Sequence, residues 1–374
     1  MKSLNIGIIS HLKYPIREPF SGGLEMHTYM LAEGLRARGH RVTLFAADQS
    51  DASLGVEPIC AATALAAVGT DEARDVSFFQ EHHAYLSLMQ RLRYSDFDLI
   101  HNNSLHYLPV SLADLLPMPM VTTLHTPPFC WLESGFVCEK GHNNTTVAIS
   151  KTVAHLWARV MKVDEIILNG IDLGQFAYHN EAEAPVYAIW YGRIVPEKGL
   201  HYALDAAHLA GIPLKIAGPV SDQVYFAHEI APRFTRFSDT CEYLGHVEHA
   251  QLATLIGGAS VSLCTPCWEE PYGLVVVESL AAGVPVAGFS RGALPELIDE
   301  QSGALATPDS AIALQKAIER AMKCTRAACR ARAEAVADKQ VMLDHYEALY
   351  RRLVFASSTF AERKIKSSFG NERV

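Results

Sequence analysis

Two basic residues in the second half of the chain lie in a loop that could hold a phosphate group. Arg193 and Lys198 belong to the segment Gly192–Gly199, which follows an apolar run and precedes a helical pattern. Arg and Lys side chains bind phosphate oxygens, and the free N–H groups at a helix start favour the same negative charge. We interpret this loop as a pyrophosphate site. The alternative is a solvated loop with ordinary surface charges.

A later loop in the same half carries two carboxylates. Glu270 lies just before the segment 271–274, and Glu278 lies in the helical pattern that follows it. Glu278 could accept both hydroxyls of a ribose, and Glu270 could contact a hydroxyl of a sugar. The N–H groups at the helix start could face a phosphate. The interval between the two glutamates means little alone, because Glu25 and Glu33 share it.

The first half offers a glycine pair and a histidine at a strand end. Gly22 and Gly23 precede a helical pattern, where the backbone could approach a phosphate closely, although such a pair is also an ordinary turn. His125 ends an apolar run, where an imidazole could donate to a reacting sugar or order it. A lone histidine is more often structural. The turn Asn169–Asp172 follows another apolar run.

Strands and helices must position these residues, and the chain alternates between the two patterns twice. The expected strands are 5–10, 41–46, 97–101, 120–124, 146–149 and 165–168, then 186–191, 213–217, 241–244, 260–264 and 284–289. The expected helices are 23–38, 200–210, 250–257 and 273–282, with one or two more over 309–350. Strands separated by helices require crossover connections, which give parallel sheets with ligands at the carboxyl ends of the strands.

Taken in order, these motifs resemble the retaining GT-B glycosyltransferases of glycosyltransferase family 4. The resemblance runs from about Ile6 to Ala304, and five motifs in order are far more specific than any one of them. They are G-G-x-E at 22–25, His125 at a strand end, N-G-I-D at 169–172, G-R-x-x-x-E-K-G at 192–199 and E-x7-E at 270–278. The chain departs from the family at Cys267, where Ser is common, and at Asn103, where relatives often have His.

The resemblance implies an α/β protein of the GT-B fold, with two Rossmann-like domains facing each other across a cleft. The implied division is an acceptor-side domain over 1–174, a nucleotide-sugar-binding domain over 175–350, and a tail over 351–374 that could cross back to the first domain. The polar segment Gln175–Pro185 is the best linker candidate. We expect the end of the chain from Ser357 to be partly mobile unless it docks.

The resemblance also implies a role for each residue. Arg193 and Lys198 would neutralise the diphosphate leaving group, and Glu270 would bind a hydroxyl of the transferred sugar. Glu278 would hold the ribose, and His125 would lie near the reacting centre. The other implied donor contacts are Gly22 and Gly23 at the phosphate, the backbone of Tyr272, Gly273 and Leu274, and the region of His246 and Val247 at the base.

The implied reaction is transfer of a hexosyl unit from a nucleotide-diphosphate sugar to an acceptor that the sequence does not identify. A UDP-sugar such as UDP-glucose is the first choice of donor, and GDP-mannose is the second. We favour a front-face reaction with retention, in which the departing phosphate takes the proton of the acceptor. The alternatives are a UDP-sugar epimerase of similar fold and a non-catalytic subunit that binds sugar nucleotides.

We expect no cofactor and no metal ion. The sequence has no Asp-x-Asp at a strand end, and its 17 histidines show no metal-ligand spacing. Cys264 and Cys267 form an isolated C-x-x-C, which invites a zinc or redox interpretation. Packing at the end of a strand is the interpretation we prefer, because no second pair accompanies it.

Composition and charge exclude other classes of protein. The net charge of −9 argues against a broad nucleic-acid surface. No apolar run could span a bilayer, and the first residues lack the apolar core of a signal peptide, so we expect a cytoplasmic protein. Peripheral membrane contact through His82–Tyr94, which mixes leucines with Arg91 and Arg93, is open but not favoured. An ordinary amphipathic helix packed on its own domain is preferred.

Overall fold

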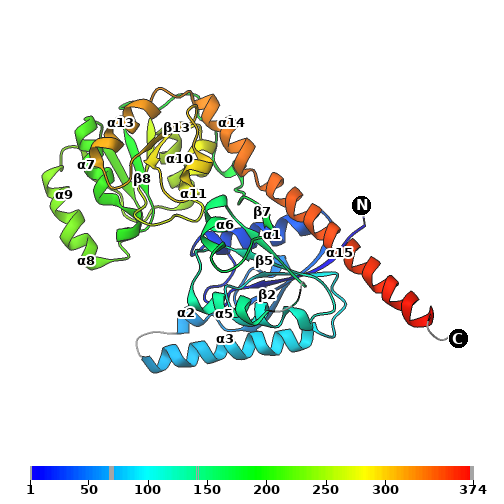
Figure 1. Cartoon of the computed structure of the whole chain (residues 1–374). Helices are drawn as coiled ribbons and strands as arrows, with labels where there is room; N and C mark the ends of the chain where they lie inside the picture. Colours follow the sequence, from blue (N-terminus) through cyan, green and yellow to red (C-terminus); the bar gives the residue numbers. More distant parts are fainter. Residues whose placement is uncertain (1, 67–70, 140, 142, 371–374) are drawn as a thin grey trace. The chain divides into compact units, whose positions relative to one another are not determined.

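The computed structural model divides the chain into two compact units (Figure 1), and it describes residues 2–66, 71–139, 141 and 143–370. The first unit comprises Met1–Ile149, Val153–Ile167 and Gln340–Val374, and the second comprises Ser150–Thr152 and Leu168–Lys339. The predicted linker, Gln175–Pro185, lies inside the second unit. There the backbone N–H of Glu183 donates to the carbonyl of Gly258 at 2.9 Å.

The first unit is built on a seven-stranded sheet in the order β3-β2-β1-β4-β5-β6-β7, and its paired strands run parallel. The strands are β1 Asn5–Ser10, β2 Arg41–Ala47, β3 Val56–Cys60, β4 Leu99–Asn103, β5 Met120–Leu124, β6 Asn144–Ala148 and β7 Glu165–Ile166. The helices between them are α1 Gly23–Ala37, α2 Thr63–Ala66, α3 Asp71–Leu92, α4 Tyr107–Ser111, α5 Cys130–Cys138 and α6 Lys151–Trp157. The sequence pattern did not reveal β3, because Glu57 and Pro58 interrupt its apolar character.

The second unit is built on a six-stranded parallel sheet in the order β10-β9-β8-β11-β12-β13. Its strands are β8 Ala188–Tyr191, β9 Leu214–Ala217, β10 Cys241–Tyr243, β11 Val261–Cys264, β12 Val286–Phe289 and β13 Gly303–Ala306. Its longer helices are α7 Leu200–Ala210, α9 Ala231–Arg236, α10 His249–Gly258, α11 Leu274–Ala281, α13 Ala311–Ala321 and α14 Arg326–Ala337. The predicted α/β class is confirmed by these two parallel sheets.

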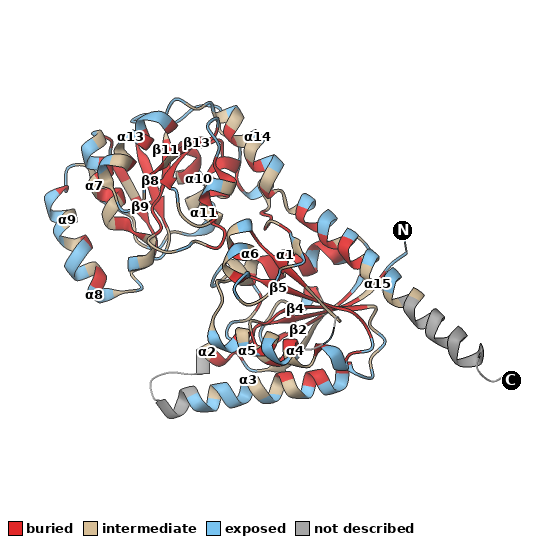
Figure 2. Ribbon diagram, viewed as in Figure 1, coloured by how far each residue is buried: buried red, intermediate tan, exposed pale blue. Residues whose placement is uncertain are grey.

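Apolar strands and the inner faces of the helices form a core in each unit (Figure 2). In the first unit Ile6, Ile8 and Leu44 are fully buried, as expected for central parallel strands that are covered on both faces. Leu31 and Leu35, one helical turn apart on α1, pack into the same core. Burying one such side chain stabilises the fold by roughly 1.5–3 kcal/mol. Several of them fix the strands in the core, and the residues at the carboxyl ends of the strands are thereby kept in place.

The region 309–350 forms more helices than the one or two predicted. After α13 and α14, a third helix, α15, runs over Lys339–Gly370. Its first half packs on the first unit, where Leu343, Tyr346 and Tyr350 are buried in the core. Gly34 of α1 permits this close approach, because a Cβ atom there would lie 2.3 Å from a methyl carbon of Leu343.

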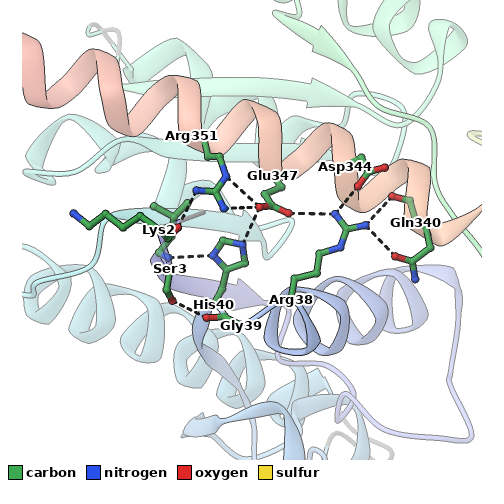
Figure 3. A network of polar contacts seen from close by, with 10 residues as sticks. Lys2, Ser3, Arg38, Gly39, His40, Gln340, Asp344, Glu347 and Arg351 are labelled. Atoms are coloured by element: carbon green, nitrogen blue, oxygen red, sulfur yellow. Dashed lines mark hydrogen bonds and ion pairs between the residues drawn. The ribbon is translucent and has the colours of Figure 1, made fainter.

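A polar network fastens α15 to the start of the first sheet (Figure 3). The carboxylate of Glu347 accepts from Arg38 at 3.2 Å and from Arg351 at 2.5 Å, and it lies 3.4 Å from His40. Burial acts to raise the pKa of Glu347, but the hydrogen bonds and charges of the two arginines outweigh burial and hold the pKa below its usual value. Residues far apart in the sequence are thereby joined in one unit.

Candidate functional site

The loop after β8 places Arg193 and Lys198 at the carboxyl end of the second sheet. It ends in a short 3-10 turn, Pro196–Lys198, followed by Gly199 in the left-handed region (φ 65°) and the start of α7. Arg193 is exposed. Within the described part of the chain its guanidinium has no hydrogen bond or ion pair. Five N–H donors are therefore available to an anion there.

Lys198 lies against the second predicted loop, the one after β11. Its Nζ atom is 2.6 Å from Oε2 of Glu270, and the side chains are 29% and 12% exposed. The indole N–H of Trp268 donates to the same carboxylate oxygen at 2.9 Å, and Nζ also lies 5.6 Å from the centre of the Trp268 ring. The structure thus brings Lys198 and Glu270 together in a partly buried ion pair.

Hydrogen bonds to backbone carbonyl groups hold these two loops side by side. The hydroxyl of Thr265 lies 3.0 Å from the carbonyl oxygens of both Lys198 and Gly199, and the N–H of Cys267 donates to the carbonyl of Glu197 at 2.8 Å. A Cβ atom on Gly199 would lie 2.1 Å from the carbonyl oxygen of Thr265. Gly199 is therefore needed for its positive φ and for this close approach.

Glu278 lies in α11, one turn beyond the glycine that opens the helix. Gly273 occupies the N-cap in the left-handed region (φ 99°), and Leu274 is the first helical residue. Burial raises the pKa of Glu278 to about 7, although a hydrogen bond with Tyr191 acts in the opposite direction. Tyr191 is itself buried at the end of β8, and its hydroxyl lies 2.7 Å from the carbonyl oxygen of Val275.

Tyr272 contributes its side chain to structure rather than to an open surface. The ring is 3% exposed, and the hydroxyl donates to the carbonyl of Asn169 at 2.5 Å. The predicted turn Asn169–Asp172 thereby joins the Glu270 loop. Oδ1 of Asn169 is buried and has no hydrogen-bond partner in the described part of the chain. That oxygen is a polar group that a ligand hydroxyl could satisfy.

His246 and Val247 follow β10, two strands away from β8 in the same sheet. His246 is exposed and Val247 is half-buried. The preceding Gly245 accepts from the N–H of Gly218 at 2.7 Å, so the ends of β10 and β9 lie together. All the predicted residues of the second unit therefore follow the carboxyl ends of its strands, where ligands of such sheets bind.

In the first unit the predicted glycine pair precedes α1. Gly22 is the N-cap, in an extended conformation that other residues also adopt, and Gly23 is the first helical residue. The carboxylate of Glu25 forms a buried ion pair with His11 at 3.0 Å. Burial acts to raise the pKa of Glu25, but His11 and the backbone N–H groups of Glu25 and Gly22 lower it below its usual value. Part of this helix start is thus bound by Glu25 itself.

His125 follows β5 and is 7% exposed. Its Nε2 atom lies 2.9 Å from Oδ1 of Asn103. Burial, with His27 and His101 nearby, lowers the pKa of His125 well below its usual value, so the imidazole is neutral. Because the Asn103 oxygen accepts, Nε2 carries the proton and Nδ1 is left as an acceptor. Asn103, the residue that departs from the family pattern, therefore sets the tautomer of His125.

A second buried histidine, His101, contacts the same oxygen of Asn103. The Nε2 atom of His101, on β4, lies 3.1 Å from Oδ1 of Asn103 and 2.8 Å from the Thr123 hydroxyl. Its Nδ1 atom is hydrogen-bonded to the hydroxyl of Tyr350 on α15. Burial lowers the pKa of His101 to about 3, so it also stays neutral. Asn103, the hydrogen-bond partner of His125, is thus connected through His101 to Tyr350 of α15.

Sequence reasoning missed several polar partners in these sites. His11, Asn103 and Trp268 each contact a predicted residue, although none was assigned a role. His11 and Asn103 stand at strand ends, as His125 does, so the same positional signal could have identified them. Trp268 is adjacent to the Glu270 motif, but nothing in its spacing indicates a contact with that carboxylate.

No group of three or more His, Cys, Asp or Glu side chains suited to a metal ion occurs among the described residues. Cys264 is buried at the end of β11, where burial raises the pKa of its thiol to about 12, and Cys267 is half-buried in the loop that follows. The helices in the described part of the chain are all too short or too polar to cross a membrane.

Two family models match the chain, one to each half. Residues 21–175 match the model described as Glycosyltransferase Family 4, and residues 175–337 match the one described as Glycosyl transferases group 1. Together the matches run from the glycine pair to the end of α14. Every residue predicted to bind or to react lies within them. Both matches are to transferases, which does not favour the epimerase alternative.

Curated relatives and solved structures agree with this result. The chain is 25% identical over 353 residues to glycogen synthase of Mycobacterium tuberculosis, with 83% of this chain and 84% of the relative covered. It is 24% identical over 330 residues to the phosphatidyl-myo-inositol mannosyltransferase of the same organism, with 82% and 83% covered.

Two solved structures show the same fold. Sucrose-phosphate synthase from Thermosynechococcus elongatus has a TM-score of 0.74 and is 22% identical in sequence to this chain. HepE from Anabaena, in complex with UDP and glucose, has a TM-score of 0.69 and is 18% identical. Each comparison covers 94% of this chain and 100% of the other. These likenesses support the predicted GT-B fold.

Proposed function

Because the chain belongs to the GT-B glycosyltransferases of the family 4 type, we propose that it transfers a hexosyl unit from a nucleotide-diphosphate sugar with retention of configuration. The observation that carries this proposal is the loop pair of the second unit. There a guanidinium without a bound partner, a lysine and two helix starts follow the carboxyl ends of neighbouring strands. These groups suit a diphosphate.

The chemistry follows from the charge that develops when the sugar–phosphate bond breaks. Negative charge grows on the leaving diphosphate, and positive charge grows on the sugar ring. Arg193 and Lys198 stabilise the diphosphate, together with the N–H groups of Gly273 and Leu274. Lys198 is held for this task by Glu270, whose second oxygen can bind a hydroxyl of the transferred sugar.

The first unit contributes the groups near the reacting centre in this proposal. Neutral His125 presents Nδ1 as an acceptor for a sugar hydroxyl, and Gly23 approaches the donor phosphate. No carboxylate is assigned as a nucleophile, so we propose a front-face displacement in which the departing phosphate oxygen takes the proton of the acceptor. The bond from the acceptor oxygen forms on the face from which the phosphate leaves. Configuration is therefore retained, and no metal ion takes part.

The donor is proposed to be a UDP-sugar, with GDP-mannose as the second choice. Supporting this order, HepE is described in complexes with UDP-glucose and with UDP and glucose. Glu278 would accept the two ribose hydroxyls, and the backbone at His246 and Val247 would border the base. Because nucleotide sugars are products of cytoplasmic metabolism, we propose the cytoplasm as the place of reaction.

A panel of nucleotides and nucleotide sugars tests the proposal. Thermal stability is measured with UDP, GDP, ADP and their hexose conjugates, and nucleotide release is then followed by chromatography. One diphosphate should stabilise the protein selectively, and its sugar conjugate should be consumed. Lys198→Ala should lower turnover by about a hundredfold or more with the fold intact, whereas exposed Lys323→Ala should not change it. Stabilisation by none of them, or unchanged turnover in Lys198→Ala, would refute the proposal.

A further inference from the structure

Aromatic side chains form a row on the surface of the first unit that the proposed chemistry does not use. The ring centres of Phe78 and Trp131 lie 5.1 Å apart, and Phe78 lies 6.2 Å from His82, whose ring is 6.1 Å from that of Tyr107. Trp131 is 53% exposed and Phe78 is 36% exposed. We call these four residues the aromatic row. Large exposed rings in contact with one another mark binding surfaces.

Each member of the row comes from a segment that follows a strand of the first sheet. Tyr107 begins α4 just beyond β4, and Trp131 lies in the first turn of α5 beyond β5. Phe78 and His82 belong to α3, which connects β3 to β4. Figure 2 shows α4 and α5 alongside α3 in this unit. The row therefore lies on the helices that leave the ligand-binding edge of the sheet.

The row is connected to His125 by a short series of contacts within the same unit. Asn103, which holds His125, is followed by Ser104, whose hydroxyl accepts from the N–H of His106 at 3.2 Å. The ring of His106 stacks on Tyr107 with the centres 4.7 Å apart. A ligand lying along the row would thus extend toward the histidine that we place at the reacting centre.

We propose that the aromatic row is the acceptor subsite and that the acceptor presents a neutral pyranose ring, an inference that rests on the proposed function. A pyranose has an apolar C–H face that stacks on aromatic rings and an edge of hydroxyls that requires hydrogen bonds. The row offers both surfaces. Phe78 and Trp131 supply the faces. The hydroxyl of Tyr107 and Nδ1 of His82 are hydrogen-bonded to each other at 3.0 Å, which leaves a lone pair of the Tyr107 oxygen and Nε2 of His82 for the hydroxyls of a ligand.

The charges around the row favour a neutral ligand over an anionic one. Among the described side chains of α3 up to His82, Asp75 and Glu81 are acidic and none is a lysine or an arginine. On α5, Glu133 near Trp131 is paired with Arg159, so this pair adds no net positive charge beside the row. Such surroundings repel phosphate and carboxylate ligands. They also repel an anionic membrane surface, to which an interfacial helix would present a basic face.

The test follows acceptor and donor steps separately in the full-length protein. The probes are methyl glycosides of maltose, cellobiose and lactose, with vesicles of phosphatidylglycerol as the alternative ligand. At least one glycoside should raise nucleotide release above the rate of donor hydrolysis and change the emission of exposed Trp131, as judged against Trp131→Phe. Phe78→Ala and Trp131→Ala should raise the acceptor KM about tenfold and leave donor hydrolysis and donor KM unchanged.

Tyr94→Ala is the matched control, because Tyr94 is an 83% exposed aromatic residue of the same unit outside the row. It should leave every constant unchanged. The proposal is overturned if no glycoside acts, if both row variants keep the wild-type acceptor KM, or if vesicle binding is what Trp131→Ala abolishes. Absence of donor hydrolysis in the wild-type protein would instead refute the proposed function, so the two failures are distinguishable.

Discussion

Two glutamates of the second unit differ in their partners, and the difference decides what each can do. Glu270 is ion-paired with Lys198 and receives the indole N–H of Trp268, so its position is fixed. Glu278 has no cation at hydrogen-bond distance among the described residues, and burial raises its pKa to about 7. A carboxyl group with that pKa changes its charge at physiological pH. In the proposed donor site, its ionisation should therefore make donor binding depend on pH.

Donor affinity should depend on the ionisation of Glu278. A carboxylate can accept from two ribose hydroxyls, whereas the protonated group keeps fewer acceptor sites. As pH falls from 8 to 6, the group takes up its proton and the affinity for UDP-glucose should fall several-fold. Calorimetric titration at each pH measures this change.

Glu278→Gln provides the control for that pH series. The amide does not titrate, so its affinity should be weaker at pH 8 and nearly constant down to pH 6. A wild-type affinity that does not change with pH, or a pH dependence that persists in Glu278→Gln, would remove the ribose role from this residue.

The residues that follow strand ends could be predicted from the sequence, because the pattern of strands and helices fixes which positions come last. Their partners could not. Lys198 and Glu270 are 72 positions apart, and Asn103 and His125 are 22 apart. Such contacts depend on which strands are neighbours and on side-chain direction, and neither is encoded in local spacing.

At the scale of elements, most strands and helices follow from apolar periodicity, and the exceptions have physical reasons. Strand β3 lies at the edge of its sheet and tolerates Glu57 and Pro58. Strand β13, with the sequence GALA, has none of the β-branched residues that indicate a strand. Helix α15 was predicted only as part of the region 309–350, and it continues past that region to Gly370.

Helix α15 should depend on Glu347 for its attachment to the first unit. Glu347→Ala removes the carboxylate that Arg38 and Arg351 share, so we expect a loss of stability of about 1–3 kcal/mol and a lower thermal midpoint. The exposed pair between Arg352 and Glu165 is the control. Arg352→Ala should cost less than about 1 kcal/mol, because solvent screens this pair. Thermal unfolding of both variants measures the difference.

The difference in stability between the wild type and Glu347→Ala should itself depend on pH. The pKa of Glu347 is lowered in the folded protein, so its contribution is fully present above the usual value near 4.5 and is lost as pH falls through the lowered pKa. Glu347→Ala and the wild type should therefore converge in acid. Equal midpoints at neutral pH would contradict this role for α15.

At the scale of the whole molecule, the alternation of strands and helices, which occurs twice along the chain, is the feature that the sequence predicts well. Two alternating segments gave two parallel sheets, and every predicted site residue follows a strand end in one of them. The division of the chain by contacts falls at Leu168 and Lys339, whereas the sequence placed its boundaries at 174/175 and 350/351. The predicted linker was polar, as linkers are, but polar residues also cover the surface of a domain.

The cationic site that we propose for a diphosphate in the second unit can be tested directly by comparative titration. Affinities of UDP and UMP, with GDP and GMP alongside, are measured by calorimetry for the wild type and for the double variant Arg193→Gln, Lys198→Gln. We predict that one diphosphate binds at least about tenfold more tightly than its monophosphate, and that the double variant loses this preference. Equal affinities in the wild type, or an undiminished preference in the double variant, would contradict the account.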